Sequence, residues 1–192
     1  MNDSLSETRR YANFESALSN QLRESIRDVK DYPKPGIVFK DITPVLAKPE
    51  LVYSIIEEQA QYWKLHGIEA VIGVEARGFI LGSLLAQALK CSFIPVRKSG
   101  KLPAKCISQA YDLEYGESVI EIHEDSISRG CKTLIHDDLL ATGGTSLAAA
   151  QLVERLGGAV SGFSFLINLG FLEGERKINR LYRVPLIYQI QY

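Results

Sequence analysis

Apolar residues recur at helical spacing in two segments near the start of the chain. In the first, apolar side chains three or four positions apart predict an amphipathic helix. They are Phe14, Ala17, Leu18, Leu22 and Ile26. Two prolines and a glycine in residues 31–36 then favour extended and turn conformations, which end this helix. A second helix is predicted from about Pro49 to His66, and Gly67 suits a left-handed cap after it.

Downstream, short apolar runs alternate with helical patterns. Four apolar strands are predicted at residues 70–74, 92–96, 133–136 and 161–167. Helices are predicted at 79–89 and around 149–156, and a final edge strand at 184–192. Continuous apolar strands separated by helices are typical of a parallel sheet covered on both faces. The pattern therefore predicts an α/β fold with a mainly parallel central sheet flanked by helices.

The stretch between residues 97 and 130 is longer and more polar than the rest. Within it, residues 119–122 alternate like one arm of a hairpin. There are no internal repeats and no low-complexity tract. We expect one domain over residues 14–192, preceded by an N-terminal arm over residues 1–13.

Composition narrows the class of protein. A chain of 192 residues supports one sizeable core but not two ordinary domains. A net charge of −1 provides no overall basic field to attract nucleic acid or acidic membranes. Three unpatterned cysteines fit a reducing compartment. No stretch resembles a signal peptide or approaches the ~20 apolar residues of a membrane span. These features predict a cytoplasmic protein that binds neither nucleic acid nor membranes.

The strongest chemical signal is the segment TLIHDDLLATGGTS at residues 133–146. An apolar strand leads into two carboxylates, then into a turn of Thr and Gly, and then into a helix. Ligands of open α/β sheets bind beyond the carboxyl ends of the strands. Glycines let the backbone present several N–H groups, the hydroxyls add donors, and the helix offers its positive end. We predict a phosphate site formed by Ala141, Thr142, Gly143, Gly144, Thr145 and Ser146.

The two carboxylates need a different partner, because they repel phosphate. Asp137 and Asp138 precede the phosphate site and are well placed to accept hydrogen bonds from sugar hydroxyls. Together the two parts fit a ribose 5-phosphate. The alternative is a surface turn capped by Asp and Thr. A Walker-type loop is excluded, because the segment has no Gly-Lys-Ser/Thr ending.

The same residues resemble the phosphoribosyl-pyrophosphate motif of the type I phosphoribosyltransferases. This resemblance implies displacement of pyrophosphate from the anomeric carbon of ribose by a base nitrogen. It also implies Mg²⁺, bound mainly through the sugar pyrophosphate and water and not by protein ligands. His136 stands where the family usually has an aliphatic residue. It is either a hydrogen-bonded structural histidine or a residue that acts beside Asp137.

Residues 31–46, DYPKPGIVFKDITPVL, resemble the base-binding segment of the adenine-specific branch of this family. The resemblance implies a hood over the base, with main-chain contacts from Val38 and Lys40 and with Phe39 in the pocket. The alternative is a loop that only packs the first helix on the core. Lys40 replaces the usual Arg. This change matters little if the contact is through the backbone, and matters more if the side chain packs on a neighbour.

Two further segments resemble the pyrophosphate-binding parts of the family. GVEARGF at 73–79 follows a strand and opens a helix, and RKSGKLPAK at 97–105 carries four cations without an anion. A cationic run is otherwise an ordinary solvated face. The resemblance implies that pyrophosphate is bound by Ala76, Arg77, Gly78, Arg97, Lys98 and Lys101. In the family some of these contacts cross a dimer interface, so a homodimer is expected.

The segment YDLEYG at residues 111–116 resembles the end of the family's flexible catalytic loop, which we place at about 99–116. The resemblance implies that Glu114 is the general acid/base near the imidazole nitrogens of the purine. It implies that Tyr115 helps to seal the site. Taken without the resemblance, Glu114 is one of several acids in an acidic stretch.

These resemblances imply transfer of the 5-phosphoribosyl group from phosphoribosyl pyrophosphate to adenine, giving AMP and pyrophosphate. One alternative is a sister enzyme that uses hypoxanthine, guanine, xanthine or orotate, which residues 31–46 and 111–116 disfavour. Another is a noncatalytic regulator that senses the sugar pyrophosphate and binds nucleic acid. The short chain and the net charge of −1 disfavour that reading.

Overall fold

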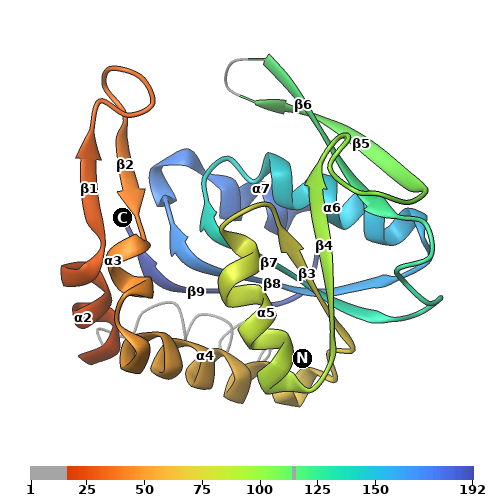
Figure 1. The fold of residues 1–192 in the computed structure, drawn as a ribbon, viewed down its shortest axis with the longest axis horizontal. Coiled ribbons are helices and arrows are strands. Elements are labelled where there is room, and N and C mark those ends of the chain that lie inside the picture. Colours follow the sequence, from red (N-terminus) through yellow and green to blue (C-terminus); the bar gives the residue numbers. More distant parts are fainter. Residues whose placement is uncertain (1–16, 114–115) are drawn as a thin grey trace.

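The computed structural model describes residues 17–113 and 116–192 and has an α/β architecture (Figure 1). Its centre is a seven-stranded sheet of order β5-β6-β4-β3-β7-β8-β9. The strands are β3 (Ala70–Val74), β4 (Ser92–Lys98), β5 (Cys106–Leu113), β6 (Gly116–His123), β7 (Lys132–Leu140), β8 (Ala159–Asn168) and β9 (Leu186–Gln191). A separate antiparallel ribbon pairs β1 (Arg27–Lys30) with β2 (Val38–Asp41).

Helices cover both faces of the sheet, as the sequence predicts. They are α2 (Ala17–Ser25), α3 (Thr43–Leu46), α4 (Pro49–Trp63), α5 (Gly78–Leu89), α6 (Gly144–Arg155) and α7 (Gly174–Leu181), with 3₁₀ turns η1 (Lys64–His66) and η2 (Gly170–Leu172). Pro49 opens α4, and Gly67 ends η1 with a left-handed φ of 64°. Among these helices, none is long and apolar enough to cross a membrane.

The five strands β4-β3-β7-β8-β9 are parallel, and β9 is an edge strand, as predicted. In chain order they run 2-1-3-4-5, so the direction of the crossovers reverses between β3 and β7. Open sheets of this order bind ligands at the carboxyl ends of the two strands that flank the reversal. The segments after β3 and at the end of β7 are therefore the place to look for a site.

Two apolar cores lie on opposite faces of the sheet. On one face α4 and α5 bury Trp63, Leu81 and Leu85 against strand residues such as Leu134. On the other face α6 buries Leu152 and its neighbours against Ile135 and the rest of that face. Consecutive residues of β7 thus face different cores, as expected for a strand covered on both sides. Each buried Leu or Ile side chain contributes roughly 1.5–3 kcal/mol.

The polar stretch after β4 differs from a plain loop. Residues Cys106–Leu113 form β5, which pairs along its length with β6 as an antiparallel hairpin. This hairpin joins the main sheet where Arg97 and Lys98 pair with Glu121 and Ile120. The predicted flexible loop at 99–116 therefore contains a strand. Its mobility stays a prediction.

β7 is longer than the predicted strand at 133–136. It continues through Asp137 and Asp138 to Leu140, and Asp137 still pairs with Phe165 of β8. On its other side the pairing with β3 ends at His136. The two acids thus lie on a strand that has lost one neighbour, and not in the turn that follows it.

His136 lies fully buried on β7, and Gly82 of α5 packs closely against it and against the Phe93 ring. A Cβ built on Gly82 would lie 3.1 Å from His136 Cδ2. Within the described chain neither ring nitrogen has a hydrogen-bond partner. The expectation of a hydrogen-bonded structural histidine is therefore wrong in its hydrogen bond, because packing of the apolar helix α5 against the strand leaves no donor or acceptor there.

We predict that acid destabilises this protein partly through His136. Burial lowers the pKa of His136 to about 4, from 6.5 for an exposed histidine. Between these values the unfolded chain holds a proton that the folded chain does not, so stability falls as pH falls from 6.5 towards 4. His136→Leu should remove up to ~3 kcal/mol of this loss. Urea unfolding at pH 7 and pH 4.5 tests it, and an equal loss in both proteins would contradict it.

Candidate active site

The turn between β7 and α6 forms the floor of a cavity of about 330 Å³. The cavity is lined by Asp137, Leu139, Leu140, Ala141, Thr142, Gly143, Gly144, Thr145, Ser146 and Leu172. All six predicted phosphate residues therefore surround one space, together with the first predicted sugar carboxylate. Leu172 comes from η2 and carries no sequence signal that points to a ligand.

Two glycines shape this turn. Gly143 has a φ of 78°, a left-handed conformation that suits glycine, and it is the N-cap of α6. Gly174, at the start of α7, lies so close to the turn that a Cβ there would collide with the carbonyl oxygen of Ala141. The turn is thus held from behind by α7, a contact that the sequence analysis did not identify.

The N-terminus of α6 has the features of an anion site. Gly143 offers no side chain to cap the first turn, and that turn contains no acidic residue. The first amides of a helix lack intrahelical partners and carry a partial positive charge. Because Gly144, Thr145 and Ser146 line the cavity, these amides and hydroxyls are available to a phosphate group.

Asp137 and Asp138 meet the turn that follows β3. The Asp138 side chain is 4% exposed, and its Oδ2 lies 3.0 Å from Nε of Arg77. Gly78 allows this approach, since a Cβ on it would lie 2.9 Å from Oδ1 of Asp137. In the same turn the Glu75–Ala76 peptide bond is cis. The predicted sugar and pyrophosphate segments are therefore in direct contact.

Burial raises the pKa of both carboxyls. For Asp137 the charge of Asp138 adds to the effect of burial, and for Asp138 the Arg77 guanidinium opposes it. The backbone N–H of Asp138 donates to Oδ1 of Asp137 at 2.9 Å. Two adjacent carboxylates, one of them almost fully buried, favour hydroxyl donors and cations as ligands.

Arg77 also connects the carboxylates to the β1–β2 ribbon. Its guanidinium carbon lies 4.7 Å from the centre of the Phe39 ring, and the Tyr32 ring packs edge-on to Phe39 at 5.2 Å. The predicted base-binding residue Phe39 is thus next to the predicted sugar site. Val38, beside it, is 46% exposed.

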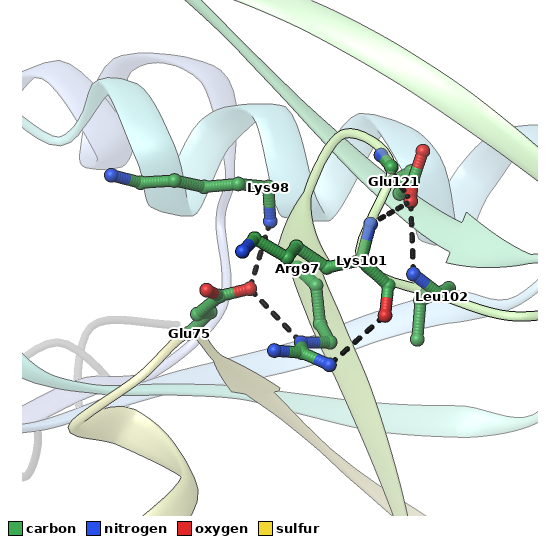
Figure 2. Close-up of polar contacts among 7 residues, drawn as sticks. Glu75, Arg97, Lys98, Lys101, Leu102 and Glu121 are labelled. Carbon is green, nitrogen blue, oxygen red and sulfur yellow. Dashed lines mark hydrogen bonds and ion pairs between the residues drawn. The ribbon is translucent and has the colours of Figure 1, made fainter.

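The cationic segment that begins at the end of β4 is held by acids from elsewhere in the chain. Glu75 Oε2 accepts hydrogen bonds from Nε of Arg97 and from the backbone N–H of Lys98, both at 3.0 Å (Figure 2). Arg97 also donates to the carbonyl oxygen of Lys101 at 3.0 Å. The Lys98 ammonium extends away from this network. Glu75 therefore joins the turn after β3 to the end of β4, where the cationic segment begins.

Glu121 of β6 holds the other side of the same segment. Its Oε1 accepts hydrogen bonds from three successive backbone N–H groups, at 2.9, 3.1 and 3.2 Å (Figure 2). The donors are those of Gly100, Lys101 and Leu102. Although burial raises the pKa of Glu121, these amides outweigh it and hold the pKa below its usual value. The sequence pattern of four cations did not indicate that Glu75 and Glu121 hold this segment in place.

The catalytic pair expected from the sequence, Glu114 and Tyr115, lies outside the described residues. The other predicted site residues gather around the carboxyl ends of β3, β4 and β7 and the adjacent ribbon. Leu139, Glu75, Glu121 and Gly174 were not predicted. Leu139 and Glu75 adjoin predicted residues in the chain, whereas Glu121 and Gly174 reach the site only through folding.

Comparison with known proteins agrees with this geometry. Residues 47–175 match the phosphoribosyl transferase domain family. A protein of Myxococcus xanthus named adenine phosphoribosyltransferase is 50% identical over 166 residues, which cover 86% of this chain and 90% of that protein. The chain belongs to the adenine phosphoribosyltransferase family.

Solved structures of this family share the fold. The adenine phosphoribosyltransferase of Rhodothermus marinus is 48% identical, with a TM-score of 0.85 over 91% of this chain and 98% of that one. The Saccharomyces cerevisiae enzyme, solved with adenine and an iminoalditol bisphosphate, is 34% identical, with a TM-score of 0.83 over 90% and 98%. These similarities show that the α/β fold of this chain is that of the family.

We predict that Asp137→Asn stabilises the protein against unfolding and weakens its binding of phosphoribosyl pyrophosphate. Since the raised pKa means that the folded state binds the proton more tightly, stability falls as pH rises from 3.8 through that pKa. An uncharged amide avoids this loss and should add about 1–2 kcal/mol to the unfolding free energy at pH 7. The gain should vanish near pH 3.5. Thermal unfolding with and without phosphoribosyl pyrophosphate measures both effects, and a less stable variant would contradict the assignment.

We also predict that Glu121 holds the cationic segment in place. Glu121→Ala leaves three backbone donors without their acceptor, which costs roughly 1–3 kcal/mol for each one that stays buried. The KM for phosphoribosyl pyrophosphate should rise about tenfold, as expected for ~1.4 kcal/mol of lost binding. The matched control is Glu124→Ala, an exposed acid just after the end of β6. Equal effects of the two substitutions on KM would reject this role.

Proposed function

We propose that this protein transfers the 5-phosphoribosyl group from phosphoribosyl pyrophosphate to adenine, forming AMP and releasing pyrophosphate. One observation carries the proposal: the phosphate cavity, Asp137 and Asp138, Arg77 and Phe39 follow one another in contact. In AMP the 5-phosphate, the ribose and the base follow one another, as do the phosphate cavity, the two carboxylates and Phe39, and Arg77 lies beside the carboxylates, where pyrophosphate would leave. The yeast relative solved with adenine and a sugar-bisphosphate analogue supports it.

The cavity around Ala141–Ser146 would bind the 5-phosphate of the sugar. Its uncapped helix amides and its hydroxyls supply hydrogen bonds to a dianion. Because this group takes no part in bond breaking, its binding energy can position the reacting carbon.

Asp137 and Asp138 would hold the ribose hydroxyls. As pyrophosphate leaves, positive charge grows on the anomeric carbon, and nearby carboxylates stabilise it. Arg77 neutralises part of the charge of Asp138 and is proposed to face the leaving group as well, with the amides of Ala76 and Gly78. The two carboxylates would therefore keep enough negative charge to accept hydrogen bonds from the ribose hydroxyls. Arg77 would reduce their repulsion of pyrophosphate.

Arg97, Lys98 and Lys101 would neutralise the departing pyrophosphate. Glu75 and Glu121 set the shape of this segment, as their hydrogen bonds show. The described residues contain no cluster of three or more metal-ligating side chains. Mg²⁺ usually binds through one or two carboxylates, water and substrate phosphates, and the exposed part of Asp137 at the cavity fits that mode through water. When bound, the ion would supply positive charge to the leaving group.

β2 would read adenine through its backbone. Val38 and Lys40 are two residues apart, so their N–H and C=O groups point to the same edge of the strand. One edge of β2 pairs with β1, and the described strands place nothing on the other. We propose that Val38 and Lys40 present these groups to the open edge, where the donor and acceptor edge of adenine would pair with them beside Phe39. Glu114 is proposed to move the proton of the base nitrogen, and Tyr115 to help exclude water.

We further infer a cytoplasmic homodimer. Ile80 and Leu84, four residues apart on α5, are 41% and 36% exposed, and Tyr53 on α4 is 63% exposed. Exposed apolar side chains on neighbouring helices favour a protein partner. The three cysteines are free thiols, which fits a reducing compartment. Sedimentation analysis tests the dimer.

The test of the reaction is an assay of pyrophosphate release with phosphoribosyl pyrophosphate, Mg²⁺ and one base at a time. We expect turnover with adenine, and at least tenfold lower kcat/KM with guanine, hypoxanthine, xanthine and orotate, since the backbone of β2 matches the edge of adenine. Turnover only with another base would overturn the substrate assignment.

We predict that Glu114→Ala lowers kcat by about 10²- to 10⁴-fold, the usual contribution of a general acid/base. The affinity for phosphoribosyl pyrophosphate should stay within about twofold, because the sugar and phosphate contacts lie elsewhere. Isothermal titration and steady-state kinetics separate the two quantities. The matched control is Glu124→Ala, which should keep its kcat. Equal loss of affinity and turnover would remove Glu114 from this role.

A further inference from the structure

The β1–β2 ribbon stands apart from the main sheet, beside the end of β9 (Figure 1). It carries the residues proposed to bind the base, while the sugar and phosphate residues lie on β7 and α6. The position of the ribbon over the sheet therefore decides whether base and sugar meet. Two contacts from successive residues of β2 join the ribbon to the body of the protein.

The first contact is that of Phe39 with Arg77, at 4.7 Å from guanidinium carbon to ring centre. The second contact is also one between a cation and an aromatic ring. Nζ of Lys40 lies 3.7 Å from the ring centre of Tyr192. In one contact the ribbon supplies the ring and the body the cation, and in the other the roles are exchanged. Because side chains alternate along a strand, the two contacts hold β2 from opposite faces.

The Lys40 side chain is well placed for a strong interaction. It is 11% exposed, and Nζ also donates to Oδ1 of Asp28 on β1 at 2.7 Å. A cation over a ring gains more when water is excluded. The ion pair aligns Nζ within the ribbon, and the ring of Tyr192 ties that aligned ammonium to the body.

Tyr192 is itself firmly positioned. Its backbone N–H donates to the carbonyl oxygen of Asn168, and its carbonyl oxygen accepts from the N–H of Gly170, both at 3.0 Å. A second cation, Arg23 of α2, lies 5.3 Å from the ring centre. The backbone of Tyr192 is thus fixed to the end of β8, and its ring lies next to Arg23 of α2 and Lys40 of the ribbon.

We propose that Tyr192, acting through the Lys40 ammonium, sets the position of β2 over the sheet and is a positioning residue for the base. It touches neither the sugar site nor the phosphate cavity. Its loss should therefore weaken the use of adenine and spare the use of phosphoribosyl pyrophosphate. This inference rests on the proposed function, in which the backbone of β2 reads adenine.

Steady-state kinetics of Tyr192 variants test the proposal. Tyr192→Leu should raise the KM for adenine roughly 3- to 10-fold, the factor expected from loss of one largely buried cation–π contact. The KM for phosphoribosyl pyrophosphate should change less than about twofold, since the substitution weakens only the binding of the base. Tyr192→Phe keeps the ring and should stay within about twofold of the unsubstituted protein for both substrates.

Two more substitutions separate positioning from general destabilisation. Lys40→Met should raise the adenine KM at least as much as Tyr192→Leu, because it also removes the ion pair with Asp28. Adding Tyr192→Leu to Lys40→Met should raise the adenine KM no further, because the contact between ring and ammonium is already lost. Arg23→Met removes the other cation from the same ring and should leave the adenine KM unchanged. The proposal is overturned if Tyr192→Leu leaves the adenine KM unchanged, if both KM values rise alike, or if Tyr192→Phe behaves like Tyr192→Leu.

Amide hydrogen exchange gives a readout that does not depend on adenine turnover. The amides of Val38–Asp41 should exchange faster in Tyr192→Leu and Lys40→Met, and at the unsubstituted rate in Tyr192→Phe. Unchanged exchange in Tyr192→Leu would overturn the contact as a determinant of ribbon position. If the unsubstituted protein makes no AMP, the proposed function fails, and the exchange rates still decide the role of the ring.

Discussion

The ion pair between Arg77 and Asp138 joins the parts on which the site depends. Asp138 lies on β7 with almost no exposure, and Arg77 lies in the turn between β3 and α5. A buried carboxylate beside a second carboxylate is unfavourable unless a cation is close. The guanidinium that meets this need also packs on Phe39 of the ribbon. One cation therefore links the strand with the sugar carboxylates, the turn proposed for pyrophosphate, and the strand proposed for the base.

A protein that binds a polyanion has to place carboxylates with care, and here each acid near the site has a distinct contact. Glu75 orients Arg97 and holds the backbone of Lys98, and Glu121 gathers three amides of the segment that follows. Neither acid cancels the Lys98 ammonium, which extends away from the network. The acids thus shape the cationic segment and leave positive charge for a ligand. The same logic applies to the phosphate cavity, where the first turn of α6 has no acid at all.

Local patterns in the sequence predict much of this architecture. The period of apolar residues predicted the parallel sheet and its helices, because burial on two faces requires continuous apolar strands. Pro49 and Gly67 marked the ends of a helical segment through backbone preferences that act within a few residues. The order of acids, Thr, Gly and helix start predicted the residues of one cavity, since strand, turn and helix are neighbours in the chain.

Only the tertiary structure decided the contacts between residues that lie far apart in the chain. Pairing with β8 carries β7 through Asp137 and Asp138, and pairing with β6 turns a polar segment into a strand. The acids that organise the cations come from the turn after β3 and from β6, and the ring on Lys40 comes from Tyr192. A sequence pattern records burial and local backbone preference. It does not record which distant side chain fills a given space, and packing of the finished sheet decides that. The sequence by itself thus determined the parallel strands and their main helices, the family and the phosphate segment, whereas the fold decided the partners of Arg97 and Lys40 and the apolar surroundings of His136.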